Sequence, residues 1–287
     1  MGNISLSRLR TRALAALVAL FAMMALATAA DAANYVGLGD SYTAGPAIPI
    51  QLPPVGCLKS SNNYPHLAAS KLGLPLRDPS CSGARTEHMT QPQGVSPGPN
   101  PPQFDSLDAA TTVVTLTIGG NDIGFSSIAQ DCVSQNPTGS PCQAKYVVGG
   151  RDEVSARIAA AAPKVAAVLQ GIHSRSPQAK LYLLNYIAIL PDSGPGCWPQ
   201  MPIAEGDVPW VRAKQKELNA MLADQAAAND ARLVDVYSES IGHDACQLPG
   251  IRWNEPLVPL NLAAPLHPNL LGMMAMSRSV VAAVGSG

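Results

Sequence analysis

The fold class is decided by the stretch VVTLTIGGND, residues 113–122. Its first six residues are apolar or β-branched throughout, which is typical of a β-strand buried on both faces. The two glycines that follow end the strand. Because strands buried on both faces belong to parallel sheets covered by helices, the stretch predicts an α/β protein.

Strand and helix patterns alternate along the rest of the chain. The short apolar pattern of strands recurs at residues 35–39, 75–80, 180–186 and 232–236. Helical patterns cover residues 63–72, 152–174 with an interruption at Pro163, 207–229 and 269–284. Alternation of this kind indicates parallel strands joined by helical crossovers. We therefore predict a three-layer α/β/α sandwich around a parallel sheet of about five strands, flavodoxin-like in strand order.

Three long stretches break this alternation, at residues 91–104, 192–209 and 242–265. All three are punctuated by proline, so we expect them to be loops. Long loops in such folds usually shape the ligand site.

The start of the chain has the pattern of an export signal. Arg8, Arg10 and Arg12 precede an apolar run at residues 13–27, and small residues at 27–32 offer cleavage sites. The run is shorter than the roughly 20 apolar residues of a membrane-spanning helix; a single N-terminal anchor is the alternative. We expect a signal peptide over residues 1–32 and a single secreted domain, without a transmembrane segment, over residues 33–287.

The composition describes a globular protein with few charges. Of the 287 residues, 47% are hydrophobic and only 14% charged, and the net charge is −1. No cluster of Lys or Arg follows the N-terminus, whereas binding to nucleic acid phosphates requires a dense basic surface. Nucleic acid is therefore excluded as a partner. Separately, we expect the protein to be a monomer.

The cysteines indicate an oxidising compartment. They are Cys57, Cys81, Cys132, Cys142, Cys197 and Cys246. An even number in an exported chain predicts disulfides, and sequence alone leaves many pairings open. The spacing favours neighbours in order: Cys57–Cys81, Cys132–Cys142 and Cys197–Cys246. No C-x-x-C pair is present, so we expect no metal site.

Chemically useful groups stand where the predicted strands end. The first strand runs into Asp40 and Ser41, the second into Gly83, and the third into Asn121. His267 stands just before the closing helix. Ligands of open parallel sheets bind beyond the carboxyl ends of the strands, so we expect these groups to meet there.

Together these groups meet the needs of a serine nucleophile. The Ser41 hydroxyl needs a base, and the pKa of a histidine such as His267 lies near working pH. The oxyanion formed on attack needs preplaced N–H donors. The Ser41 N–H, the Gly83 N–H and the Asn121 amide would supply them. Such a reaction requires no metal and no organic cofactor.

The same residues carry a family resemblance. The segments GDSY (39–42), Gly83, GGND (119–122) and HPN (267–269) resemble the four blocks of the GDSL/SGNH hydrolase family, in the family's order. The likeness spans residues 34–284 and is greatest to secreted actinobacterial lipases and esterases with three sequential disulfides. It implies catalytic Ser41 and His267, and hydrolysis of lipid or simple carboxylic esters through an acyl-enzyme on Ser41.

One family position differs in this chain. Many members have an aspartate three residues before the histidine, where this chain has Ala264. Some members of the branch resemble it in using a backbone carbonyl at that point. We therefore expect a Ser41–His267 dyad in which the Ala264 carbonyl accepts from Nδ1–H of His267 and fixes the tautomer of the ring.

Three other interpretations stay open at this point. Ser41 could simply cap a helix. A carbohydrate O-acetyl esterase would use the same residues, and a preference for acetyl over long acyl chains would reveal it. A non-catalytic secreted binding module on the same fold would usually display an aromatic platform, against which the aromatic content of 5% speaks.

Overall fold

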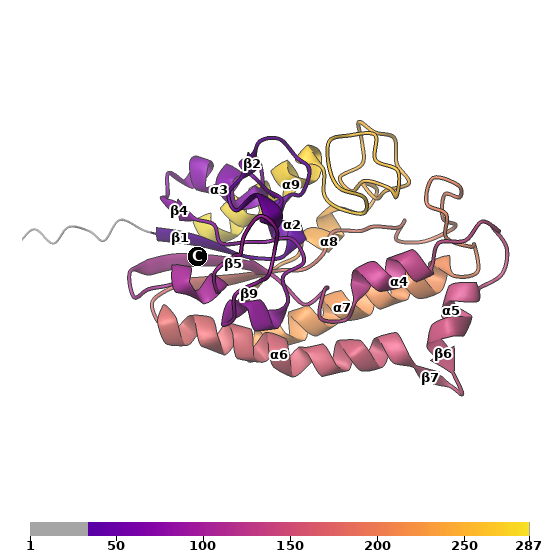
Figure 1. The fold of residues 1–287 in the computed structure, drawn as a ribbon, viewed down its shortest axis with the longest axis horizontal. Helices are drawn as coiled ribbons and strands as arrows, with labels where there is room; N and C mark the ends of the chain where they lie inside the picture. The colour runs from indigo at the N-terminus through magenta and orange to yellow at the C-terminus, as the bar shows by residue number, and fades with distance from the viewer. Residues whose placement is uncertain (1–33, 287) are drawn as a thin grey trace, which may run out of the picture. The chain divides into compact units, whose positions relative to one another are not determined.

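A five-stranded sheet forms the centre of the computed structural model, which describes residues 34–286 (Figure 1). Its strands are β1 (Asn34–Gly39), β4 (Leu76–Arg77), β5 (Thr111–Thr117), β8 (Lys180–Leu184) and β9 (Arg232–Val234). All are parallel, in the order β4-β1-β5-β8-β9. This is the flavodoxin-like order, so the predicted fold class is confirmed.

Strand β5 lies in the middle of the sheet, between β1 and β8. All of its residues except Thr112 are buried. A buried polar side chain is tolerated when it is hydrogen-bonded, and Thr115 Oγ1 lies 2.8 Å from the Tyr35 hydroxyl of β1. The strand is therefore covered on both faces, as its apolar and β-branched sequence predicts.

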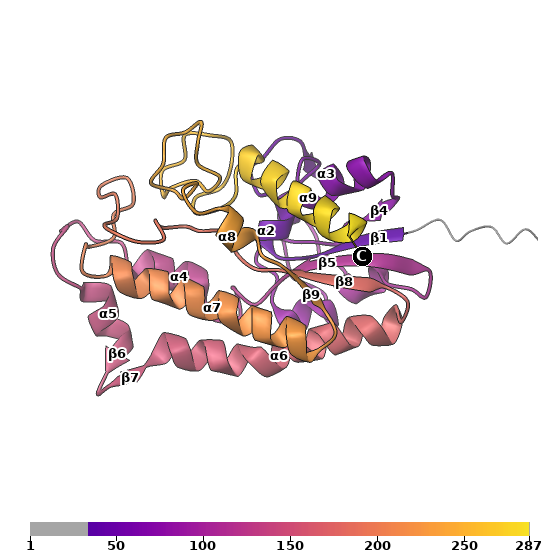
Figure 2. The same ribbon diagram turned by 180° about the vertical axis from the view of Figure 1, so that it is seen from behind.

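Helices cover both faces of the sheet. On one face α3 (Tyr64–Leu72) packs beside α9 (Leu270–Gly285), and on the other α6 (Glu153–Arg175) packs beside α7 (Val208–Ala228). Figure 2 shows the same two pairs from behind, with the sheet between them. Strands and helices share one hydrophobic core, which includes Val36, Leu116, Ile172, Leu183 and Met276.

Three of these helices begin at a side chain that caps them. Asn63, Asp152 and Asn269 precede α3, α6 and α9, and the side-chain oxygen of each accepts a backbone N–H from the first turn. Such a bond satisfies a donor that the helix itself leaves unpaired. The helices therefore start within one residue of the predicted positions.

The interruption expected at Pro163 does not occur, because α6 runs through it. A proline inside a helix removes one hydrogen bond and leaves the carbonyl four residues earlier without its donor. Pro163 and Ala159 both lie on the exposed side of α6. Water can therefore solvate the freed carbonyl, and the helix continues.

Several short elements lie outside the predicted pattern. Short helices are α2 (Ser41–Ala44), α4 (Phe125–Asp131), α5 (Pro141–Tyr146) and α8 (Val236–Glu239). Two hairpins pair β2 (Gln51–Leu52) with β3 (Lys59–Ser60) and β6 (Val147–Val148) with β7 (Arg151–Asp152). The 3₁₀ turns are Val55–Cys57, Thr86–Met89 and Gln103–Ser106. Elements this short contain too little periodicity to be recognised in a sequence.

The predicted disulfide pairing is confirmed. The bonds are Cys57–Cys81, Cys132–Cys142 and Cys197–Cys246. Each restricts the unfolded chain and so stabilises the fold by roughly 2–4 kcal/mol. Over residues 34–286, no helix has the length and apolar character needed to span a membrane. The predicted signal peptide lies outside the described residues.

Candidate active site

Ser41 stands at the carboxyl end of β1, as the first residue of α2. The turn between strand and helix requires Gly39, since a Cβ at that position would lie 2.6 Å from the Thr117 carbonyl oxygen and closer still to Thr43 Oγ1. Asp40 caps α2 by accepting the N–H of Tyr42 at 2.9 Å. The turn therefore holds the Ser41 hydroxyl at the edge of the sheet where ligands of this fold bind.

His267 reaches Ser41 from the other end of the sequence. Its Nε2 lies 2.7 Å from Ser41 Oγ, although 226 positions separate the two residues. His267 belongs to the short segment between the loop after α8 and the cap of α9. The structure thus brings together the two residues that the sequence proposes as nucleophile and base.

The acceptor at Nδ1 of His267 is a correction to the expected Ala264. Nδ1 lies 2.7 Å from the carbonyl oxygen of Pro265, whereas the Ala264 carbonyl accepts the backbone N–H of His267 at 3.2 Å. The reason is a turn at Leu266, whose φ of 60° is left-handed. That turn points the carbonyl two residues before the histidine toward its ring. The acceptor is still a backbone carbonyl, as expected, but it is one residue further along the chain.

Tyr42 contacts the segment that contains His267. Its hydroxyl donates to the Leu266 carbonyl at 2.7 Å, and its ring centroid lies 5.3 Å from that of His267. Because Tyr42 follows Ser41 directly, Ser41 and His267 are tied to each other through neighbouring residues. This contact was not predicted from the sequence.

The buried ion pair of Arg252 and Glu255 also supports the segment that contains His267. The carboxylate of Glu255 accepts from Arg252 Nε at 3.1 Å and Nη2 at 3.0 Å, and both side chains are almost completely buried. Asn261 and Asn269 each donate to it at 2.7 Å. The backbone of Glu255 pairs with that of His267 and Leu266 in a ladder of two bonds, at 3.0 and 3.1 Å.

The charge state of Glu255 follows from these donors. Burial by itself would raise its pKa, but the hydrogen bonds from Asn269, Asn261 and Arg252 outweigh burial and lower the pKa to about 2. The carboxylate is therefore ionised at neutral pH. No sequence pattern marks Glu255 as important, because its partners Arg252, Asn261 and Asn269 stand at irregular spacings in and beside a loop.

Asn121 and Gly83 lie on neighbouring turns. Asn121 donates its side-chain amide to the Ala84 carbonyl at 2.9 Å, which ties the turn after β5 to the turn that contains Gly83. Gly83 has a left-handed φ of 79°. Of the predicted site residues, Ser41, Asn121 and His267 line one cavity, and Gly83 is not among its lining residues.

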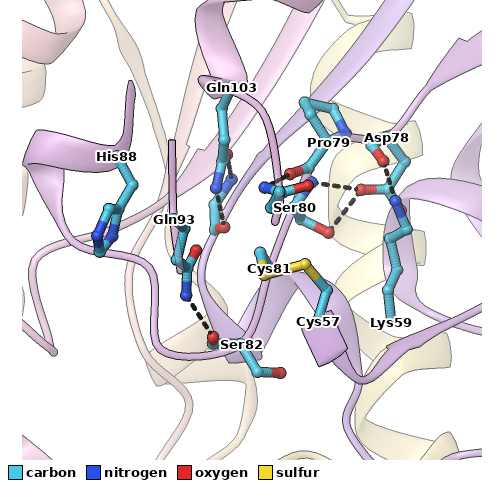
Figure 3. The surroundings of a disulfide bond; sticks show 12 residues. Cys57, Lys59, Asp78, Pro79, Ser80, Cys81, Ser82, His88, Gln93 and Gln103 are labelled. Carbon is cyan, nitrogen blue, oxygen red and sulfur yellow. Dashed lines mark hydrogen bonds between the residues drawn. A yellow bond between two sulfur atoms is a disulfide. The ribbon is translucent and has the colours of Figure 1, made fainter. Parts of the chain in front are cut away.

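The Cys57–Cys81 disulfide anchors the turn of Gly83 (Figure 3). Cys81 N–H donates to the Gly39 carbonyl at 3.1 Å, so the turn is attached directly to the end of β1. Ser82 N–H donates to the Cys57 carbonyl at 2.9 Å, and its own carbonyl accepts from the Gln93 amide at 2.8 Å. The position of this turn therefore depends on tertiary contacts on both sides of the disulfide.

Tyr186 is a site residue that the sequence did not reveal. Its hydroxyl donates to Asp40 Oδ2 at 2.6 Å and accepts the Gly120 N–H at 2.8 Å, so it connects the turns after β1 and β5. Burial raises the pKa of Asp40 to about 7, against the hydrogen bonds from Tyr186 and Tyr42. The only available signal was its place at the end of the fourth predicted strand, residues 180–186.

The cavity beside Ser41 has a volume of about 210 Å³. Its lining is mainly apolar and includes Phe125, Ala129, Ile189, Leu218, Leu257 and Leu266. A hydroxyl and an imidazole in the lining of an apolar cavity can hold an uncharged ester with its acyl chain against the walls. Within residues 34–286, no cluster of His, Cys, Asp and Glu side chains is arranged to bind a metal ion.

Known proteins resemble this chain over most of its length. The model of the GDSL-like lipase/acylhydrolase family matches residues 38–275. Lipase 2 of Streptomyces coelicolor is 38% identical over 261 residues, which cover 88% of this chain and 86% of that protein. A lipase of Streptomyces rimosus is 30% identical, with 84% and 82% covered.

Solved structures share the fold. The crystal structure of an extracellular lipase from Streptomyces rimosus superposes with a TM-score of 0.71 at 28% identity, covering 89% of this chain and 99% of that one. A phospholipase A1 from Streptomyces albidoflavus superposes with a TM-score of 0.73, at 24% identity and with the same coverage. The ester hydrolase expected from the sequence is confirmed, and the chain belongs to the GDSL-like lipase/acylhydrolase family.

Proposed function

We propose that this ester hydrolase works through an acyl-enzyme on Ser41, with His267 as general base. His267 takes the Ser41 proton as the oxygen attacks the ester carbonyl, and then gives it to the departing alcohol. Water attacks the acyl-enzyme by the same route. The observation that carries the proposal is the 2.7 Å separation of His267 Nε2 and Ser41 Oγ in the lining of the apolar cavity.

The Pro265 carbonyl fixes the tautomer that this reaction requires. A carbonyl oxygen can only accept, so the proton on His267 resides on Nδ1, and Nε2 presents its lone pair to Ser41. In place of a carboxylate, a carbonyl orients the ring but stabilises the imidazolium less. Catalysis in this chain therefore depends more heavily on how firmly the segment around His267 is held.

The oxyanion would be held by the Ser41 N–H, the Gly83 N–H and the Asn121 amide. Within residues 34–286, neither of the two backbone groups donates to a protein acceptor, and only one amide hydrogen of Asn121 is needed for Ala84. Three preplaced donors at one carbonyl would supply electrostatic stabilisation without reorganisation during the reaction.

The substrates we propose are carboxylic esters with an apolar acyl chain longer than acetyl. The apolar walls of the cavity support this choice over the carbohydrate O-acetyl esterase, whose acyl group would leave those walls uncovered. The names of the relatives, lipase and phospholipase A1, agree with it. The three disulfides and the extracellular relative support export of the chain. That the protein is a monomer stays a prediction.

A chain-length series tests the substrate proposal. Purified protein is assayed on p-nitrophenyl acetate, butyrate, octanoate and palmitate, and kcat/KM is compared across the series. We expect octanoate to exceed acetate by at least about tenfold, because the added methylenes are buried against the cavity walls at about 0.8 kcal/mol each. Acetate as the best substrate would favour the carbohydrate O-acetyl esterase, and hydrolysis of none of the four esters would contradict the proposed substrate class.

The pH dependence of kcat/KM should follow His267. Burial lowers the pKa of His267 below its usual 6.5, although the hydrogen bond to the Pro265 carbonyl opposes this shift. The base must be neutral to accept a proton, so kcat/KM should rise with pH and pass its half-maximum below pH 6.5. Initial rates on a dissolved ester between about pH 4.5 and 8 provide the measurement.

Asp40 is the control for that profile, since burial raises its pKa to about 7. In Asp40→Asn the acidic limb should persist, because His267 still titrates. His267 as the base would be contradicted if kcat/KM of Asp40→Asn no longer fell at acid pH, or if kcat/KM of wild type did not change with pH.

A further inference from the structure

The loop after α8 carries an apolar surface that the reaction itself does not use. Val258, Leu260 and Leu262, here called the apolar rim, are 73%, 72% and 69% exposed. No Asp, Glu, Lys or Arg occurs from Pro256 to Ser277. Neighbouring exposed apolar side chains often mark a surface that binds a membrane, another protein or a ligand.

The apolar rim is held outward by the buried ion pair beneath it. The Glu255 carboxylate accepts the backbone N–H groups of Leu260 and Asn261 at 3.0 and 3.2 Å, and the Asn261 amide donates to the Pro249 carbonyl at 3.0 Å. The backbone polar groups therefore point inward to fixed partners. The side chains of the apolar rim are left facing solvent by the same bonds.

The apolar rim is continuous with the active-site cavity. Leu257 precedes it and Leu266 follows it, and both line the cavity beside Ser41. Figures 1 and 2 both show this loop projecting from the body of the molecule, next to the first turn of α9. That turn adds Leu270 and Leu271, which are also exposed. The same short segment thus forms a wall of the cavity and the outer surface beside it.

We propose that the apolar rim docks the protein on an uncharged or zwitterionic lipid surface, so that acyl chains pass directly from that surface to Ser41. The inference rests on the proposed function, because lipid acyl esters are what such a surface would present. Residues 256–277 contain no Lys or Arg, so this segment offers no electrostatic attraction to anionic lipids. Burial of aliphatic side chains supplies the binding free energy.

The test measures vesicle binding separately from turnover. Wild type, the triple variant Val258→Ser/Leu260→Ser/Leu262→Ser and the single-site control Val148→Ser are sedimented with phosphatidylcholine vesicles and, separately, with phosphatidylglycerol vesicles. The oligomeric state of each protein without lipid is measured by size-exclusion chromatography. Val148 is 69% exposed, like the apolar rim, but it lies in the β6–β7 hairpin. All three proteins are also assayed on dissolved p-nitrophenyl butyrate, which reports an intact fold and active site.

We expect the triple variant to partition onto phosphatidylcholine at least about tenfold less than wild type. Val148→Ser should partition like wild type, and all three should hydrolyse dissolved butyrate equally. Unchanged partitioning of the triple variant, or wild-type binding to phosphatidylglycerol vesicles alone, would overturn the proposal. So would dimers of wild type that the triple variant abolishes, since the apolar rim would then be covered by a second copy. Loss of ester hydrolysis in wild type would instead overturn the proposed function.

Discussion

Ser41→Ala is expected to lower kcat on p-nitrophenyl butyrate by about 10⁶-fold, as removal of the nucleophile does in other serine hydrolases. The loss is large because Oγ forms the covalent intermediate, and no other hydroxyl stands 2.7 Å from His267 Nε2 within residues 34–286. The fold should survive, since the capping of α2 depends on Asp40 rather than on Ser41. Steady-state rates and thermal unfolding, measured on the same preparation, check both expectations.

Ser126→Ala is the matched control for Ser41→Ala. Ser126 is a second serine that lines the same cavity, but it stands on α4 and has no hydrogen bond to His267. Removal of its hydroxyl should change kcat less than about tenfold, because the variant loses a packing contact in the cavity and no group that takes part in the reaction. If Ser41→Ala retained activity comparable to that of Ser126→Ala, the nucleophile would have to be sought elsewhere.

Glu255→Gln is expected to lower the free energy of unfolding by about 3–5 kcal/mol. The substitution keeps the size of the side chain but leaves the buried Arg252 guanidinium without its counter-charge. Removing one partner of a buried pair is costly because the remaining charge stays desolvated. Urea unfolding at pH 7 gives the measurement. The activity of the folded variant should fall as well, because the Glu255 side chain holds Asn261 and Asn269, which flank the segment of His267.

The control for Glu255→Gln is Glu153→Gln, which breaks the exposed pair of Glu153 and Arg157. That change should cost less than about 1 kcal/mol. The pH dependence separates the charge of Glu255 from its packing. Its pKa is about 2 in the folded protein and about 4.3 in an unfolded chain. The free energy of unfolding of wild type should therefore exceed that of Glu255→Gln above pH 4.3, and this difference should be lost as the pH falls toward 2. A difference in the free energy of unfolding between the two proteins that does not change with pH would contradict the ion-pair account.

The sheet and its covering helices could be predicted from the sequence because their signals are local. The run at 113–118 is apolar whatever surrounds it, and Asn63, Asp152 and Asn269 each cap the helix that they immediately precede. Pro163 misled the prediction because its effect depends on exposure, which the sequence does not state.

The site was predictable only in part, for the same physical reason. Ser41, Asn121 and His267 stand at the ends of recognisable elements and resemble family blocks, so they could be named before their contacts were known. The acceptor at Nδ1 could not, because it depends on the left-handed turn at Leu266. Tyr186 and the Arg252–Glu255 pair could not either. Their roles consist entirely of contacts between segments distant in sequence or held in an irregular loop.

The central claim is a covalent acyl group on Ser41, and trapping that group tests it most directly. The protein is mixed with p-nitrophenyl octanoate, quenched in acid within the first turnover, digested and examined by mass spectrometry. An octanoyl group on the peptide that contains Ser41, absent from the same peptide of Ser41→Ala, is the predicted result. An octanoyl group on any other residue, or turnover with no acylated peptide under conditions where deacylation has been shown to be slow, would contradict the account.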